Sequence, residues 1–118
     1  MEQGTGADTS TQIDAGIARI RARFVSMLED RADELYDLLD YLDDPSVRDV
    51  AYTEIQSRAH KLHGVSGSIG FPRIGEFAAK LELTIDQVRS PTHPQNVQHV
   101  RRQLEVLLEE MEQSLNAA

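Results

Sequence analysis

The chain has no cysteine and no tryptophan, and its acidic residues outnumber its basic ones. The lack of cysteine excludes disulfide bonds, thiolate metal sites and thiol nucleophiles. The formal net charge of −8 at pH 7 argues against nucleic acid and against anionic membrane surfaces, because both are bound mainly through basic residues. We therefore expect protein partners or small ligands, with no nucleic acid and no membrane.

Long apolar runs are also missing. None approaches the roughly 20 residues that span a bilayer, and the polar segment 1–12 lacks the basic and apolar regions of a signal peptide. We therefore expect a cytoplasmic protein. With 118 residues, 40% of them hydrophobic, the chain has the size of one domain with one modest core.

Apolar residues recur at helical spacing along most of the chain. Residues 1–12 predict a flexible tail, and 13–118 predict the folded domain. The first helix is expected to begin near Ile13 and to end at residues 43–45, and a break near Gly16 is possible on this pattern. Ser46 is suited to cap the next helix. The residues expected on the buried face, helix by helix, are Ile13, Ile17, Ile20, Phe24, Leu28, Ala32, Leu35, Leu39 and Leu42; Val47, Ala51, Ile55, Ala59, Leu62, Ser66 and Ile69; Ile74, Phe77, Ala78, Leu81, Ile85 and Val88; and Val97, Val100, Leu104, Leu107, Met111 and Leu115.

Glycine and proline separate the later helices. Gly70 is a suitable C-terminal stop and Pro72 fits the first turn of the third helix, whereas the two prolines in residues 90–94 predict a loop. No strand with a period of two is visible. The pattern predicts an all-α fold, an antiparallel (up-down-up-down) four-helix bundle with a flexible or short-helical N-terminal extension. Because packing the bundle leaves no separate dimer seam, we expect a monomer.

His60 breaks the apolar pattern of the second helix. On a helical wheel it points about 180° away from the centre of the apolar cluster of this helix. That cluster consists of Ala51, Ile55, Leu62, Val65 and Ile69. Arg58 falls on the apolar side, where we expect it to extend toward solvent or to pair with an acid. The residues within about 60° of His60 are Thr53, Gln56, Ser57, His63, Gly64 and Gly67.

Two glycines on the face of His60 are unusual, because a glycine inside a helix costs roughly 0.5–1 kcal/mol relative to alanine. One interpretation is that Gly64 and Gly67 keep the surface beside His60 bare, so that Gln56, Ser57 and the two glycines form a docking face. The other is that they admit a neighbouring helix or that the helix frays toward its end. The helix geometry leaves both open.

The segment 59–71, AHKLHGVSGSIGF, resembles the signature of histidine-phosphotransfer domains. The helix after it matches the family as well, through Ile74, Phe77, Ala78, Leu81 and Glu82. The resemblance implies a protein that reversibly carries a phosphoryl group on His60. The group passes between receiver-domain aspartates of response regulators, or comes from a sensor histidine kinase, in a two-component phosphorelay. The resemblance also implies that the chain has no cofactor of its own, since the receiver domain holds the Mg²⁺.

One position departs from the family pattern. The family usually has lysine three residues after the histidine, where this chain has His63, and a lysine stands instead at Lys61. Residues three apart on a helix are neighbours and residues one apart are not. We therefore expect His63 to approach a phosphoryl group on His60, with a charge that depends on its protonation, whereas Lys61 must reach around the helix.

Other functions remain as alternatives. The chain lacks the glycine loop of nucleotide-binding sites and the His-Glu…Pro signature of kinase dimerisation helices, so we expect a phosphocarrier without autonomous kinase activity. His60 and His63 could share a metal ion, with Glu82 or His93 recruited, but no definite ligand shell is visible and we expect no metal. The remaining alternative is a non-catalytic helical bundle that docks a partner and tolerates the loss of His60.

Overall fold

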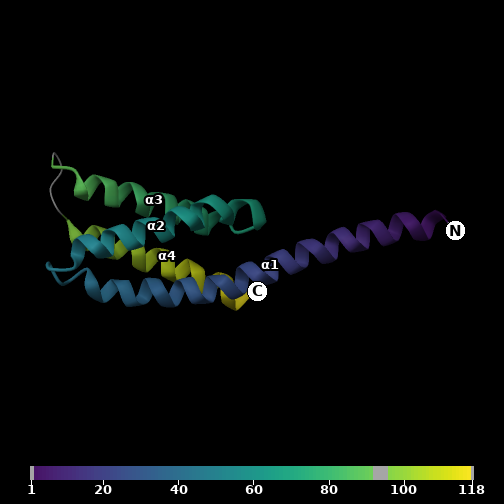
Figure 1. The fold of residues 1–118 in the computed structure, drawn as a ribbon, viewed down its shortest axis with the longest axis horizontal. Helices are drawn as coiled ribbons and strands as arrows, with labels where there is room; N and C mark the ends of the chain where they lie inside the picture. The colour runs from purple at the N-terminus through teal and green to yellow at the C-terminus, as the bar shows by residue number, and fades with distance from the viewer. Residues whose placement is uncertain (1, 92–95, 118) are drawn as a thin grey trace.

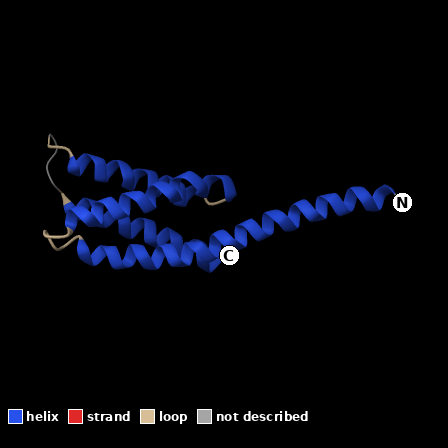
Figure 2. Cartoon of the chain, viewed as in Figure 1, coloured by secondary structure: helices blue, strands red, loops and turns tan. Residues whose placement is uncertain are grey.

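The computed structural model describes residues 2–91 and 96–117, and these ranges form helices without a strand (Figures 1 and 2). The helices are α1 (Glu2–Tyr41), α2 (Arg48–Ser66), the short 3₁₀ turn η1 (Gly67–Ile69), α3 (Pro72–Arg89) and α4 (Val97–Ala117). None of the helices in these ranges is long and apolar enough to cross a bilayer. The prediction of an all-α fold with four main helices is confirmed.

Helix α1 is longer than the sequence predicts. It begins at Glu2 and passes Gly16 without a break, so residues 2–12 are helical where a flexible tail was expected. Its 40 residues span ~60 Å at about 1.5 Å each, which accounts for most of the molecule's longest dimension of 68 Å. No proline precedes Pro45, so no residue removes a backbone donor along this helix. The division of the chain at residue 12 stays a prediction.

The N-terminal part of α1 projects beyond the other helices (Figure 1). Ile13, Ile17 and Ile20, which were expected on the buried face, keep 58%, 53% and 54% of their surface exposed. Among the residues of α1 whose burial is described, from Thr11 onward, Phe24 is the first that is buried. For the three isoleucines the prediction of a core position is therefore wrong.

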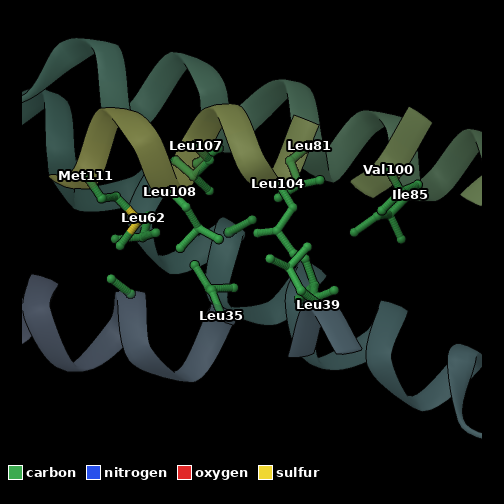
Figure 3. Close-up of a cluster of buried hydrophobic side chains, with 14 of the residues drawn as sticks. Leu35, Leu39, Leu62, Leu81, Ile85, Val100, Leu104, Leu107, Leu108 and Met111 are labelled. Atoms are coloured by element: carbon green, nitrogen blue, oxygen red, sulfur yellow. The ribbon is translucent and has the colours of Figure 1, made fainter. Parts of the chain in front are cut away.

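One hydrophobic core lies between the four helices, and Figure 3 shows part of it, with side chains pointing into the space between them. Helix α2 packs on α3, α3 on α4, and α1 on α4 and α2. The largest fully buried side chains are Leu28, Leu35, Leu42, Ile55, Leu62, Ile74, Leu81, Ile85, Leu104, Leu107, Leu108 and Met111. Each stabilises the fold by roughly 1.5–3 kcal/mol relative to an exposed position, so this core fixes how the helices lie against one another.

The turn between α1 and α2 does not use Ser46 as a helix cap. Helix α2 follows Val47 at the N-cap position, without a side-chain cap. Ser46 donates from its N–H and its hydroxyl to Oδ1 of Asp44, at 3.0 and 2.7 Å. The predicted cap is wrong because the serine side chain is engaged within the turn.

The turn between α2 and α3 follows the prediction. Gly70 has a φ of 94°, a left-handed conformation that favours glycine. The N–H of Phe71 donates to the carbonyl of Ser66 at 2.8 Å, and α3 begins at Pro72. The ring of Phe71 lies 5.1 Å from that of Phe24, which connects this turn to α1.

The predicted loop at residues 90–94 is described only in part. Helix α3 ends at Arg89, and Ser90 is extended, as a loop requires. Residues 92–94 of the prediction, including His93, lie outside the described residues.

Candidate functional site

His60 and His63 lie on the outer face of α2. Their side chains are 76% and 52% exposed. Ala59 and Leu62, their neighbours in sequence, are buried, so the core holds this part of α2 with its two histidines turned outward. The outward orientation of His60 that the helical wheel predicts is confirmed.

Glu82 of α3 binds both histidines. Nδ1 of His60 lies 2.7 Å from Oε1 of Glu82, and Nδ1 of His63 lies 3.0 Å from Oε2. The Glu82 side chain is only 20% exposed, and its helix is anchored next to it by the fully buried Leu81. A single carboxylate therefore bridges two rings on the neighbouring helix.

Gly75 allows α3 to approach α2 closely near this site. A Cβ atom at residue 75 would lie 3.6 Å from Cβ of Ser66 and 3.8 Å from the carbonyl oxygen of His63. Ser66 is fully buried, and its hydroxyl donates to the carbonyl of Leu62 at 2.5 Å. Small residues on both helices thus bring the α3 backbone against α2, close enough for a glutamate on α3 to reach the histidines.

Polar contacts hold α3 along α2 on one side of the site. Nε2 of Gln56 donates to the backbone carbonyl of Glu82 at 3.2 Å and to Oδ1 of Asp86 at 2.6 Å. Farther along, Arg89 donates to the hydroxyl of Thr53 at 2.5 Å. Gln56, expected on the docking face, is half-buried and serves the contact between the two helices.

The carboxylate of Glu82 determines which ring nitrogen of His60 is free. A carboxylate accepts hydrogen bonds and does not donate them, so the Nδ1 atoms of both histidines act as donors. In a neutral ring the proton on Nδ1 leaves the lone pair on Nε2. His60 therefore presents a nucleophilic nitrogen to solvent, and a positive charge on its ring would be stabilised by Glu82.

Gly64 and Gly67 border open space. A Cβ atom at either position would meet no atom within 4 Å beyond its own helix and chain neighbours. Neither glycine is therefore needed to admit another helix, and neither lies against a neighbouring helix as Gly75 does. Gly64 also lies inside α2, before the helix changes to the 3₁₀ turn. Ser57 is exposed on the same helix, so the structure leaves the surface around His60 bare.

Lys61 lies apart from this cluster. It lines a groove between α1 and α2, together with Met27, Arg58 and Val65. His63, in contrast, shares a shallow hollow with Gly75 and other α3 residues. Of the basic residues predicted near His60, the structure brings His63 to Glu82 and places Lys61 on the side of α1.

The sequence alone does not identify Glu82 as the partner of His60. The sequence shows Glu82 only as part of the third helix's pattern and as one candidate metal ligand. The sequence contains one signal for its location: Glu82 comes directly after Leu81, a predicted core residue, and so lies at the border of the buried face. The distance along α3 that brings it level with His60 depends on the packing of the two helices.

A protein-family model described as "Hpt domain" matches residues 19–117 of the chain. The match includes His60, His63 and Glu82 and every residue of the buried core, which begins at Phe24. No curated protein and no solved structure shows significant similarity to the chain.

Proposed function

Because this chain belongs to the Hpt domain family, we propose that it is a histidine-containing phosphotransfer protein that carries a phosphoryl group on Nε2 of His60. One observation carries the proposal: the exposed ring of His60 is held at Nδ1 by Glu82, 2.7 Å away, so that Nε2 faces open surface. The expected partners are receiver domains of response regulators, a sensor histidine kinase, or both. We also propose that the protein is cytoplasmic and monomeric.

The proposal includes the antiparallel, up-down-up-down order of the helices. In Figure 1, α1 ends and α2 begins at one end of the bundle, and α3 ends at that same end, whereas α2 ends and α3 begins at the other. Short connections between neighbouring helices are typical of this order. It places His60 and Glu82 on adjacent helices that run in opposite directions.

The chemistry needs little from this chain. The lone pair on Nε2 of His60 attacks the phosphorus of the receiver's aspartyl phosphate, the N–P bond forms, the O–P bond breaks, and aspartate leaves as a carboxylate. The proton stays on Nδ1, so the phosphorylated ring is cationic, and the carboxylate of Glu82 stabilises it. Onward transfer to another aspartate is the reverse reaction. Positioning and charge neutralisation dominate such transfers, and the receiver supplies the Mg²⁺.

His63 is proposed to take the place of the family's usual lysine. It lies three residues after His60 and binds the second oxygen of Glu82 at 3.0 Å. When protonated, it adds a positive charge near the phosphoryl group on His60. Lys61, on the side of α1, is assigned no contact with that group.

The bare surface at Ser57, Gly64 and Gly67 is proposed as the place where the receiver docks. Its aspartyl phosphate must approach His60 to within reacting distance, and side chains around the ring would prevent this. Gly64 and Gly67 leave that space open. The chain itself is proposed to have no kinase activity and no cofactor.

A phosphotransfer assay tests the proposal. Receiver domains labelled on aspartate are mixed with the wild-type chain, with His60→Gln and with His99→Gln, which replaces an exposed histidine on α4 as a matched control. Wild type and His99→Gln should acquire acid-labile, base-stable label. His60→Gln should acquire none, although its circular dichroism should be unchanged because the side chain is exposed. A chain that binds receivers but never acquires label would instead be a docking module.

A further inference from the structure

His60, His63 and Glu82 form a group of metal-binding side chains on the outer surface of α2 and α3. One ligand atom from each residue lies within 4.8 Å of those of the other two. We propose that these residues bind a transition-metal dication such as Zn²⁺, and that the bound ion prevents His60 from accepting a phosphoryl group. The binding site stands by itself, whereas the blocked acceptance rests on the function proposed above.

The positions of the ligand atoms suit Zn²⁺ after a small adjustment. Zn²⁺ binds imidazole nitrogen at about 2.0–2.1 Å and carboxylate oxygen at about 2.0–2.2 Å, so ligand atoms in a tetrahedral site lie about 3.3 Å apart. The nitrogen–oxygen distances at Glu82 are 2.7 Å to Oε1 and 3.0 Å to Oε2, and the three ligand atoms lie within 4.8 Å of one another. The separations between ligand atoms must therefore change by at most ~1.5 Å to reach the tetrahedral value. Both rings are more than half exposed and have room to move.

The structure brings together three ligands that the sequence offers only as candidates. Two histidines one turn apart are too few for a site, but Glu82 adds a third ligand from another helix, held from below by packed core residues. Three protein ligands with a fourth position open to water is the arrangement of accessible zinc sites. Two imidazoles select zinc, copper or nickel over Mg²⁺, which prefers oxygen ligands.

A bound ion would remove the nucleophile. When a metal takes the lone pair on Nδ1 of His60, the neutral ring must carry its proton on Nε2. When the metal binds Nε2 instead, it takes that lone pair directly. In both cases Nε2 has no lone pair with which to attack phosphorus.

Calorimetric titration of the untagged chain with ZnCl₂, and separately with MgCl₂, tests the site. The wild type should bind one Zn²⁺ per chain, with no comparable Mg²⁺ binding. His60→Gln, His63→Gln and Glu82→Gln should each weaken Zn²⁺ binding by at least about tenfold, because losing even a supporting partner typically costs a metal site ~10–100-fold. His99→Gln should bind as the wild type does. Equal Zn²⁺ affinity in all these variants would overturn the proposed site.

A second experiment tests the blocked acceptance. Phosphoramidate, a small phosphoryl donor, avoids the metal site of a receiver domain. One equivalent of bound Zn²⁺ should suppress phosphorylation of the wild type, and the ratio of rates with and without Zn²⁺ should move toward one in His63→Gln. Undiminished phosphorylation of the Zn²⁺-bound wild type would overturn the block. If neither phosphoramidate nor a phosphorylated receiver labels the metal-free chain, the proposed function and the block both fail, and the titration still decides the site.

Discussion

Replacing Glu82 with glutamine removes its negative charge and one of its two acceptor oxygens. In Glu82→Gln the amide oxygen can still accept the Nδ1 proton of His60, so the lone pair stays on Nε2. The contact between Gln56 and the backbone carbonyl of residue 82 does not involve the altered side chain. What is lost is the negative charge that stabilises the phosphorylated, cationic ring, together with the second acceptor oxygen, which contacts Nδ1 of His63.

The size of the effect follows from the exposure of the pair. A hydrogen bond to a charged group contributes about 1.5–3 kcal/mol, but exposed ion pairs contribute only about 0.2–1 kcal/mol. His60 is 76% exposed and Glu82 is 20% exposed, so we expect a loss of ~1 kcal/mol, near the meeting point of those two ranges. This corresponds to a rate of phosphoryl acceptance that is lower by roughly fivefold.

Single-turnover transfer from a labelled receiver measures this rate. Glu109→Gln, which removes an exposed carboxylate on α4, controls for the change in net charge. The reasoning is refuted if Glu82→Gln transfers as fast as Glu109→Gln and the wild type. A loss as complete as that of His60→Gln would also contradict it, because the geometry assigns Glu82 a positioning and electrostatic role only.

Three further substitutions give distinct outcomes. Gly64→Leu should obstruct transfer from a receiver while leaving the free energy of unfolding unchanged or higher by about 0.5–1 kcal/mol, because its Cβ meets open space; unchanged transfer kinetics would remove the docking argument. His63→Lys should transfer at least as fast as the wild type, and a large drop would show that the imidazole has a role of its own. Arg58 donates to Glu34 and lowers the pKa of that carboxyl. The ionised Glu34 side chain therefore stabilises the fold at pH values above its unfolded pKa of about 4.3. This contribution is lost as the pH falls through the lowered pKa of the folded state. Denaturation of Glu34→Gln at several pH values should show a deficit of at most ~1 kcal/mol near pH 7 that shrinks below about pH 4; a deficit independent of pH would contradict this cause.

The helices after the first could be predicted almost completely from the sequence. Their apolar residues follow the helical period, and Gly70 and Pro72 mark a stop and a start. Even the irregular Arg58 fits, because it pairs with Glu34 at 2.8 Å and Glu54 at 2.6 Å as expected of a charge near an apolar face. Local patterns of this kind are sufficient for secondary structure and for one buried face.

Two apolar predictions failed because periodicity does not show whether a partner helix is present. Ile13, Ile17 and Ile20 continue the stripe of α1 but remain more than half exposed. The N-terminal part of this helix projects beyond the other helices (Figure 1). Val65 is 41% exposed, at the edge of the groove that also contains Lys61. Burial of these residues depends on the lengths and angles of the other helices, which the pattern of one helix does not contain.

The site was predictable only on the helix that carries His60. The helical wheel predicts its outward direction, and the resemblance to the family signature predicts its role. The link to Glu82 depends on how far α3 is displaced along α2, which arises from packing at residues such as Gly75 and Ser66. Gly64, Gly67 and Gly75 look alike in the sequence, and only their surroundings separate two that border open space from one that lies between helices.

Identification of the phosphorylated nitrogen tests the central claim most directly. The chain, labelled with ¹⁵N in its histidine rings, is phosphorylated by a receiver and examined by ¹⁵N and ³¹P nuclear magnetic resonance. Because Glu82 occupies Nδ1 of His60, the phosphorus should couple to Nε2 of this ring, with the proton still on Nδ1. Phosphorus bonded to Nδ1 of His60, or to His63 or another residue, would contradict the account of how the site is built.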